Sequence, residues 1–265
     1  MPAPSGPRLA VVTGASAGIG LALAQLISRE GRPVLAVARR AERLEALADE
    51  ARRLGYAPIT PLAEDVTAPG APARIAAAAA AQGGAAWLVN NAGFGVYGRF
   101  EGSDPERVAA MLRTNCEALV LLTHAFLPAL RGAPDAFVLN VASAAAFQPT
   151  PYMTAYGATK AFVLSFTEGL AEELRGAGVG VGAFCPGPVA TEFGRVAGTG
   201  ERFGTPPGML DAAQAARQAL AQLHRREVVR VPHPIYKLTA AVSRLLPRAV
   251  LRRVSGRLHR PTEGA

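Results

Sequence analysis

The stretch YGATK places Tyr156 and Lys160 four residues apart. In a helix, residues at this spacing lie on one face, so the phenol and the ammonium would project together. A free phenol has a pKa of about 10 and is a poor acid or base at neutral pH, but a neighbouring cation favours the phenolate and lowers that pKa. The chain has only two lysines among its 28 basic residues, and lysine offers a more compact charge than arginine. The pair predicts a tuned acid/base, although most such pairs lie on ordinary helix surfaces.

A second candidate lies near the amino terminus, where TGASAGIG follows an apolar segment and spaces Gly14, Gly18 and Gly20 as GxxxGxG. Glycines let the backbone turn sharply and approach a pyrophosphate, which the N-terminus of the following helix stabilises. A tight turn without any ligand would use the same residues. The strand–turn–helix context favours a dinucleotide site.

The residues after the next two strands indicate which dinucleotide would bind. Arg39 and Arg40 follow Ala38, where an acidic residue would select NAD through the ribose 2′-hydroxyl. Arginine would instead pair with a 2′-phosphate. We therefore expect NADP(H), with Arg39 as the main contact and Arg40 at the start of a solvated helix. Asp65 could accept a hydrogen bond from the adenine amine, and Val66 could pack on the ring.

A regular alternation of strands and helices would position these residues. Apolar segments predict strands at 9–13, 33–38, 57–62, 86–90, 136–142, 179–184 and 227–231, and helical periodicity predicts helices near 18–30, 41–54, 70–82, 105–130, 153–175 and 209–224. The pattern indicates an α/β fold: a single-domain, Rossmann-like, doubly wound parallel sheet of about seven strands, with helices on both faces and a C-terminal helical tail. Ligands of such sheets bind beyond the carboxyl ends of the strands, where the motifs lie.

No linker divides the chain, so we expect residues 1–232 to form one domain and residues 233–265 a basic amphipathic tail. Within the domain, the Gly- and Pro-rich segment 194–208 predicts a mobile flap in a flexible loop near 192–210. The amino terminus resembles a first strand rather than a signal peptide, and no segment offers about twenty lipid-compatible residues. Cys116 and Cys185 are expected to be reduced and buried, which favours a cytoplasmic protein.

The net charge of +8 is confined to one end of the chain. Residues 1–223 carry 18 basic and 18 acidic side chains, whereas the remainder carries ten basic and two acidic. We therefore expect no sequence-specific binding of nucleic acid. Apolar residues recur near helical spacing over 236–260, and Pro247 should divide this segment into two helices. The segment could lie on an anionic membrane, or pack on its own subunit or a neighbour; we favour packing, because an apolar stripe is usually core.

Further polar residues fall at the same sheet edge. NNAG (90–93) closes the fourth strand, Asn115 is an amide in an apolar helix, and Ser143 follows the fifth strand. Together with TGASAGIG, YGATK and PGPVAT (186–191), these motifs resemble the short-chain dehydrogenase/reductase family over roughly residues 8–231. Ser143 could otherwise cap a strand end, and Asn115 could be a satisfied buried amide.

The resemblance implies a role for each residue. Tyr156 would donate or accept the proton, Lys160 would lower the pKa of the tyrosine and hold the nicotinamide ribose, Ser143 would hydrogen-bond the substrate oxygen, and Asn115 would position a water. These four are the expected catalytic residues. The expected NADP(H) contacts are Gly14, Ser16, Gly18, Ile19, Gly20, Arg39, Asp65, Val66, Asn90, Ala92, Gly93, Tyr156, Lys160, Pro186, Gly187, Val189 and Thr191. The implied assembly is a homodimer or homotetramer through helices 105–130 and 153–175.

The expected substrate is a small hydrophobic ketone, aldehyde or alcohol, because the residues expected to wall the pocket are largely apolar: Phe94, Tyr97, Ala144, Ala145, Phe147, Met153 and Phe193. The four histidines have no metal-ligand spacing, so we expect no metal site. A second hypothesis is a non-enzymatic, cofactor-sensing or membrane-associated interaction protein on the same fold. The four catalytic-type residues favour the enzyme, and the basic tail is the feature that favours the second hypothesis.

Overall fold

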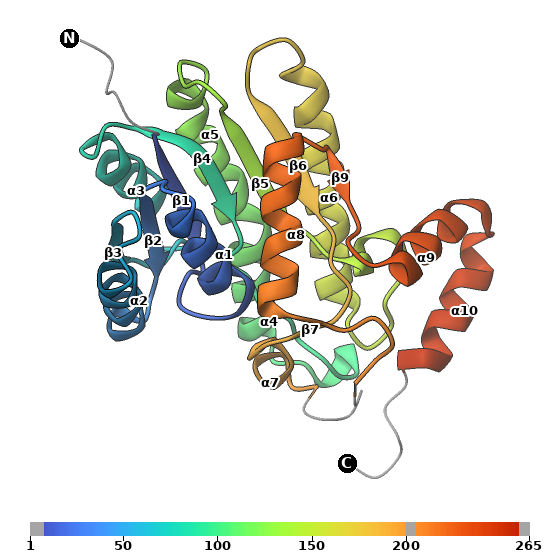
Figure 1. The fold of residues 1–265 in the computed structure, drawn as a ribbon. Helices are drawn as coiled ribbons and strands as arrows, with labels where there is room; N and C mark the ends of the chain where they lie inside the picture. Colours follow the sequence, from blue (N-terminus) through green and yellow to red (C-terminus); the bar gives the residue numbers. More distant parts are fainter. Residues whose placement is uncertain (1–7, 200–204, 260–265) are drawn as a thin grey trace.

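The computed structural model describes residues 8–199 and 205–259. Within them, one parallel sheet has the strand order β3-β2-β1-β4-β5-β6-β9, as Figure 1 shows. Its strands are β1 (Leu9–Thr13), β2 (Val34–Ala38), β3 (Ile59–Ala63), β4 (Ala85–Asn90), β5 (Phe137–Val141), β6 (Gly180–Phe184) and β9 (Val229–Arg230). The predicted doubly wound sheet of about seven strands is confirmed.

Helices cover both faces of this sheet. The larger ones are α1 (Gly18–Arg29), α2 (Ala41–Arg53), α3 (Ala71–Ala80), α4 (Pro105–Leu112), α5 (Ala118–Leu130), α6 (Thr154–Glu173) and α8 (Ala212–Arg225). One buried cluster joins α1, α2 and α8 to the sheet, and another joins α3, α5 and α6 to the opposite face. Within β1, Val11 faces one cluster and Val12 the other, which explains why a strand buried on both sides reads as a continuous apolar run.

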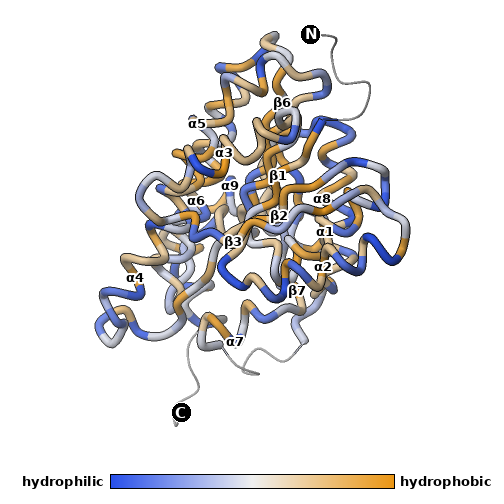
Figure 2. Tube along the Cα trace, turned by 90° about the vertical axis from the view of Figure 1, so that its left-hand side faces the viewer, coloured by the Kyte–Doolittle hydropathy of each residue, from blue (hydrophilic) through white to orange (hydrophobic). Residues whose placement is uncertain are grey.

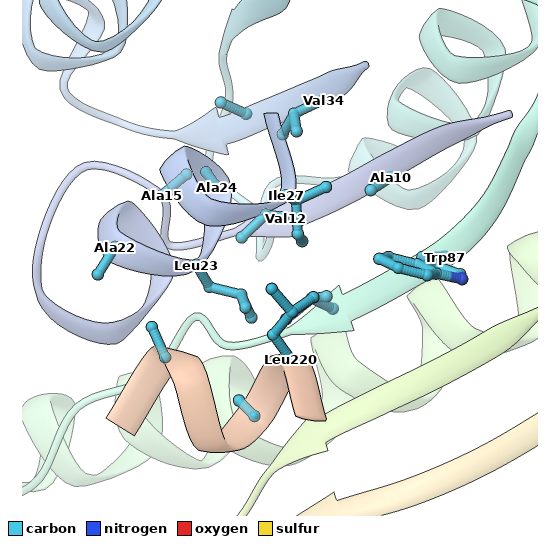
Figure 3. Packing of buried hydrophobic residues seen from close by; sticks show 14 of the residues in the cluster. Ala10, Val12, Ala15, Ala22, Leu23, Ala24, Ile27, Val34, Trp87 and Leu220 are labelled. Atoms are coloured by element: carbon cyan, nitrogen blue, oxygen red, sulfur yellow. The ribbon is translucent and has the colours of Figure 1, made fainter. Parts of the chain in front are cut away.

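The core is built from small and branched residues that pack closely. Figure 2 shows the hydrophobic residues gathered on the central strands, and Figure 3 shows Leu23 and Ile27 of α1 meeting Val12 of β1 and Leu220 of α8. The abundance of alanine lets these helices lie close to the sheet.

The strand order reverses between β1 and β4, since β2 follows β1 on one side and β5 follows β4 on the other. Open parallel sheets bind ligands at this switch point, beyond the carboxyl ends of the strands. The TGASAGIG turn follows β1 and NNAG closes β4, so the fold brings these two motifs together.

Several elements differ from the predicted bounds. The predicted helix over 105–130 is divided by a π-helical segment, η2 (Arg113–Glu117), between α4 and α5. The predicted flap begins with a short helix, α7 (Phe193–Ala197), and is flanked by a small parallel pair, β7 (Val189–Ala190) and β8 (Leu210–Asp211). Residues 200–204 of the flap lie outside the described residues. These short elements depend on contacts with distant segments, which periodicity does not reveal.

The tail forms two helices, α9 (Pro234–Leu245) and α10 (Arg248–His259), and Pro247 lies between them as predicted. Figure 1 shows both helices at one side of the molecule, beyond β9 and α6. None of the helices in the described parts of the chain is long and apolar enough to cross a bilayer.

Candidate active site

Tyr156 and Lys160 lie together on the first turns of α6, and both are buried, with 8% and 6% of their surfaces exposed. The Lys160 Nζ lies 5.8 Å from the centroid of the Tyr156 ring and donates to the Val141 carbonyl at 2.8 Å. Gly157 lets α6 pack closely on Thr150, because a Cβ at Gly157 would stand 1.8 Å from the Thr150 Oγ1. YGATK therefore fixes the pair at the end of β5.

Burial dominates the electrostatics of this pair. It raises the pKa of Tyr156 to about 12, although hydrogen bonding with Ser143 opposes the shift. Burial also lowers the pKa of Lys160 to about 8. We expected Lys160 to lower the pKa of the tyrosine. The net shift has the opposite sign in the protein alone, because the cost of burying a phenolate exceeds the stabilisation that Ser143 gives it.

Two roles were expected for Ser143 as alternatives: a hydrogen bond to the substrate oxygen, or a cap at the end of a strand. It caps a 3₁₀ helix, η3 (Ala144–Phe147), where its Oγ accepts a hydrogen bond from the Ala145 N–H at 3.1 Å. It also acts on Tyr156, where it opposes the rise in the phenol pKa that burial causes. Both can hold at once, because a hydroxyl accepts at its lone pairs and donates its single proton elsewhere. The cap fixes the direction of the Ser143 side chain.

Asn115 lies in the π-helical segment and is 1% exposed. Its Oδ1 accepts from the Phe94 N–H at 3.1 Å, and its Nδ2 donates to the Phe94 carbonyl and to the Thr159 Oγ1, both at 3.0 Å. Thr159 in turn donates to the Tyr156 carbonyl at 2.7 Å. Asn115 therefore joins the backbone after NNAG to the helix that carries Tyr156, while its expected role toward a water stays a prediction.

The glycine turn is crowded where the fingerprint requires glycine. Gly14 and Gly18 have φ angles of +67° and +56°, which side chains rarely adopt. A Cβ on Gly20 would lie 2.3 Å from the Asn91 Nδ2, and one on Gly18 would lie 3.0 Å from the Thr191 Cγ2. The turn therefore packs directly against NNAG and against the PGPVAT run. Its backbone is held by distant parts of the chain.

Asn91, rather than its neighbour Asn90, contacts this turn. The Asn90 amide is buried and donates to the Thr123 Oγ1 at 3.0 Å and the Asn140 Oδ1 at 2.9 Å, so its side chain lies in the interior rather than along the expected cofactor surface. The Asn91 Nδ2 donates to the Thr13 carbonyl at 2.9 Å. Ala92 and Gly93 continue from Asn91 at the strand end; a Cβ on Gly93 would stand 2.9 Å from the Asn115 Oδ1 and 3.7 Å from the Lys160 Nζ.

Arg39 and Asp65 face each other across the ends of β2 and β3. The Arg39 side chain is 78% exposed, and its Nη1 lies 3.9 Å from the Asp65 Oδ2. Burial raises the pKa of Asp65, but hydrogen bonds from Thr67 and the charge of Arg39 outweigh it and hold that pKa below its usual value. Val66 is buried beside them. Arg39 is thus a loosely held cation at the expected adenine end.

Arg40 is more tightly held than the sequence suggested. Its Nε and Nη2 donate to the Ser16 Oγ at 3.1 and 3.0 Å, and its Nη1 donates to the Glu192 Oε2 at 2.9 Å. Arg43 donates to the other oxygen of Glu192 at 2.8 Å. Hydrogen bonds from Arg40 and Arg43 lower the pKa of Glu192 to about 2. We expected Arg40 only to begin a solvated helix, but it ties the glycine turn to the segment before α7.

A cavity of about 430 Å³ adjoins this network on the side of α2. Its walls are Ser16, Ala17, Gly18, Leu21, Gln25, Arg43, Ala46, Leu47, Glu50, Ala190, Thr191, Glu192 and Ala212. Neither Tyr156 nor Ser143 lines it. The cavity therefore adjoins the glycine turn and not the reacting end.

The PGPVAT run connects the two ends. The Pro186 carbonyl accepts from the Ala144 N–H at 2.8 Å, beside Ser143. A Cβ on Gly187 would lie 2.3 Å from the Tyr236 ring of α9, so only glycine fits there. Val189 begins β7 and, like Ile19, packs against the cluster under α1 and α8.

The segment after this run covers Tyr156. The Phe193 ring of α7 lies 5.3 Å from the Tyr156 ring, centroid to centroid. The Ala197 carbonyl accepts from the Tyr97 N–H at 2.9 Å, and Arg107 donates to the Val196 carbonyl. These bonds hold α7 over the site. The predicted mobility of the flap is not tested.

The residues predicted to wall the substrate pocket are brought together in part. A Cβ on Gly95 would touch Phe193, Met153 and Ala197 at 2.8 to 3.3 Å, so these lie against one another near Tyr156. Phe147 instead packs against a buried cluster between α5, α6 and the sheet.

Sequence reasoning missed four residues that hold the site: Asn91, Thr159, Glu192 and Tyr236. Asn91 and Thr159 lie inside motifs that were recognised, so their polar side chains were an available signal. Glu192 and Tyr236 act on segments far away in the sequence, and no local pattern marks them.

Comparisons with known proteins agree with this geometry. The profile of the short chain dehydrogenase family matches residues 8–201. The serine 3-dehydrogenase of Agrobacterium fabrum is 39% identical over 191 residues, which cover 69% of this chain and 72% of that protein. A short-chain dehydrogenase from Sphingobium yanoikuyae, solved in complex with NADPH, has a TM-score of 0.80 at 30% identity and covers 97% of this chain and 98% of that one. One from Burkholderia phymatum, in complex with NAD, has a TM-score of 0.83 at 26% identity and covers 98% of each chain.

The chain therefore belongs to the short-chain dehydrogenase/reductase family. It is an NAD(P)-dependent oxidoreductase of the class that acts on alcohols and carbonyls. Solved relatives bind either NADPH or NAD, so the family alone does not select between the two.

Proposed function

We propose that this protein is an NADP(H)-dependent oxidoreductase that interconverts a small hydrophobic ketone or aldehyde and the corresponding alcohol. The observation that carries the proposal is the buried phenol of Tyr156, which interacts with Ser143 and lies beside Lys160 and beneath Phe193. Bound NADP(H) would supply or accept the hydride. The side chains would bind the substrate and move the proton.

Tyr156 is suited to give a proton to a carbonyl oxygen. With a pKa raised to about 12 by burial, the phenol keeps its proton at neutral pH. Negative charge that develops on the substrate oxygen would be stabilised by two aligned hydroxyl donors, Tyr156 and Ser143. The cap of Ser143 to Ala145 holds the second donor in a fixed direction before any substrate arrives.

Lys160 would stabilise the phenolate that remains after the proton has left Tyr156. An ammonium has three N–H donors, and one of them is used by the Val141 carbonyl. The other two are available to the ribose hydroxyls of the cofactor. At neutral pH the lysine remains largely charged, since its pKa is lowered only to about 8.

The residues at the nucleotide end fit a dinucleotide. The glycine turn packs closely on Asn91 and Thr191, where a Cβ would collide with them. Its backbone leads into the N-terminus of α1, which would stabilise a pyrophosphate. Two arginines after β2 favour NADP(H) over NAD(H). Arg39 is exposed and loosely paired, so it is free to bind the 2′-phosphate, and Arg40 stands next to Ser16 of the turn.

The walls near Tyr156 favour an apolar substrate. Phe193 and Met153 meet there, and the Arg107 guanidinium lies 5.8 Å from the Phe94 ring centroid, with one of its donors committed to the Val196 carbonyl. The related serine 3-dehydrogenase is named for a polar amino acid. Substrate choice in this family would therefore follow the walls of each pocket rather than the shared fold.

The test is NADPH oxidation with a panel of apolar ketones and aldehydes and of anionic aldehydes of similar size. We expect turnover of the apolar compounds and a loss of about 10³-fold or more in Tyr156→Phe, with NADPH binding retained. Tyr56→Phe, which removes a partly buried phenol elsewhere, is the matched control and should keep full activity. Turnover confined to the anionic aldehydes would refute the substrate class, and an undiminished Tyr156→Phe would refute the mechanism.

We also propose a homodimer or homotetramer that pairs through α4, α5 and α6. Large apolar side chains are exposed on these helices: Leu112, Leu121 and Phe162. Phe162 stacks on Phe166, with ring centroids 6.2 Å apart, and so presents a flat aromatic surface. Light scattering should give a mass of two or four chains that Phe162→Asp reduces; a monomer in both proteins would contradict the assembly.

A further inference from the structure

The two tail helices expose most of the large apolar residues that the structure describes in them. In α9, Ile235, Leu238, Val242 and Leu245 recur at intervals of three or four residues and so share one face. All four are exposed, Leu238 by 65% and Leu245 by 84%. The residues that α9 buries are Ala240 and Ser243. An ordinary surface helix has the opposite arrangement.

The second helix and the residues before it also expose apolar side chains. Leu246, between the helices, and Val250 and Val254 of α10 are exposed, whereas Leu251 and Ser255 are buried. We call the exposed set the tail strip: Ile235, Leu238, Val242, Leu245, Leu246, Val250 and Val254. Half of the large exposed hydrophobic residues in the described chain belong to it, and such a concentration of exposed apolar side chains in one segment points to an interaction site.

The charge around the strip has one sign. The cations on the two helices are Lys237, Arg244, Arg248, Arg252, Arg253 and Arg257, and the sequence has no acidic residue from 228 to 262. Arg230 forms an ion pair with Glu227, whose carboxylate oxygen lies 2.7 Å from the Arg230 Nη1. Among the described residues after Arg230, no cation is paired with an acidic side chain. By contrast, Arg32, Arg40 and Arg43 of the body are each paired with an acidic residue. The tail cations are therefore available to an external anion.

The tail is firmly placed on the body. The Tyr236 ring packs on Gly187, and the Tyr236 hydroxyl donates to the Pro207 carbonyl at 2.9 Å. α9 also contacts η3, the short helix that Ser143 caps. Figure 1 shows α9 and α10 standing out together at that side of the molecule. The strip is thus a surface next to the reacting end.

We propose that the tail strip and its cations dock on the surface of an anionic lipid bilayer. Apolar side chains would enter the interface, while lysine and arginines would meet lipid phosphates and carboxylates, as in basic amphipathic helices that lie on membranes. A second copy fits less well, because a two-fold interface would place this cationic surface on itself. The docking does not depend on the proposed activity, although it would bring the reacting end close to apolar compounds dissolved in lipid.

The experiment uses the full chain and flotation with vesicles of phosphatidylcholine alone or with about 30% phosphatidylserine. We expect flotation only with the anionic vesicles, weakened by 0.5 M NaCl. Leu238→Asp/Leu245→Asp should reduce binding at least about tenfold, as should Arg252→Glu/Arg253→Glu. Because all four residues are exposed, these variants should fold, which circular dichroism and melting temperature would check.

Residues on α2 provide matched controls. Arg52 and Arg53 form an exposed arginine pair, followed by exposed Leu54. Arg52→Glu/Arg53→Glu and Leu54→Asp should float like the unmodified protein. Docking is refuted if the unmodified protein stays unbound to anionic vesicles, or if tail and control variants lose binding equally. It is also refuted if the tail variants change only the oligomer mass measured by light scattering, since the strip would then be a subunit interface.

Discussion

The reacting end and the nucleotide end of this site are built in opposite ways. At the reacting end, Tyr156, Lys160 and Asn115 are almost completely buried, and neutral backbone and hydroxyl partners take their hydrogen bonds. At the nucleotide end, Arg39 and Arg40 are at least partly exposed and have carboxylate partners. At the reacting end, burial shifts the pKa values of Tyr156 and Lys160 because it removes water from their charged forms. At the nucleotide end, arginines and carboxylates instead neutralise each other in ion pairs.

This difference predicts how the two ends respond to mutation. When a buried catalytic group is removed, water cannot take over its hydrogen bonds. Its loss should therefore lower the turnover rate by orders of magnitude. An exposed ion pair is worth little and is screened by salt. Changes at the nucleotide end should therefore be moderate, specific for the cofactor phosphate and dependent on ionic strength.

After Tyr156→Phe, the largest effect is expected for Lys160→Met. The substitution keeps the apolar stem and removes the cation, so turnover should fall about 10²–10⁴-fold. Because burial lowers the pKa of Lys160, the folded protein holds this charge at a cost, and an apolar replacement should raise the melting temperature by a few degrees. Steady-state kinetics and thermal melts measure the two changes.

The test of this prediction is whether turnover falls while the melting temperature rises. A variant that loses turnover and also melts earlier would show that Lys160 acts through the structure, with its bond to Val141 dominant. Lys160→Arg keeps the charge but brings a broad guanidinium close to Gly93. It should also lose turnover, which would separate the need for charge from the need for a compact ammonium.

The reacting end could be predicted from the sequence because its residues recur in short motifs. YGATK, NNAG, Ser143 and Asn115 all lie near the same sheet edge in the structure. The sign of the tyrosine pKa shift could not be predicted, because it depends on how deeply Tyr156 is buried beneath Phe193. The spacing of residues in the sequence predicts which groups lie close together. The extent to which they are shielded from water, and therefore the direction of their pKa shifts, depends on the packing of the folded chain.

At the nucleotide end, the sequence singled out Arg39 as a candidate contact, which stays a prediction, but it did not reveal the network around Arg40. The Glu192 partner is 152 residues away from Arg40, and no period or motif links the two. The same holds for the tail, where helix spacing predicted two amphipathic helices divided at Pro247, but not that the apolar face would point outward. Contacts between distant segments decide such questions.

The next largest effect is expected for Arg39→Ala. If Arg39 binds the 2′-phosphate as proposed, its loss should weaken NADPH binding about 10- to 100-fold and leave NADH binding unchanged. Arg40→Ala should cost less, because Arg40 must share its donors with Glu192 and Ser16. Calorimetric titration with both cofactors gives the ranking. A larger loss at Arg40 would move the phosphate site toward Ser16.

A smaller change of opposite sign is expected for Glu192→Gln. This carboxylate competes with any anion for Arg40 and Arg43, so its neutral replacement should bind NADPH about 2- to 5-fold more tightly, in line with an exposed ion pair. NADH affinity should not change. Equal gains for both cofactors would indicate that Glu192 acts on the shape of the segment before α7 instead of on the phosphate.

The smallest effect is the pH dependence of stability that Glu192 confers. Hydrogen bonds from Arg40 and Arg43 lower its pKa from 4.5 to about 2. Between these values the unfolded chain binds a proton that the folded chain does not, so the stability contributed above pH 4.5 is lost as the pH falls toward 2. Because the groups are partly exposed, the advantage over Glu192→Gln should be only about 1–2 °C in melting temperature at pH 6 and should shrink by pH 3 or in 0.5 M NaCl. A difference that is constant with pH and salt would show that the carboxylate charge contributes nothing, and that Arg40 is held by Ser16 alone.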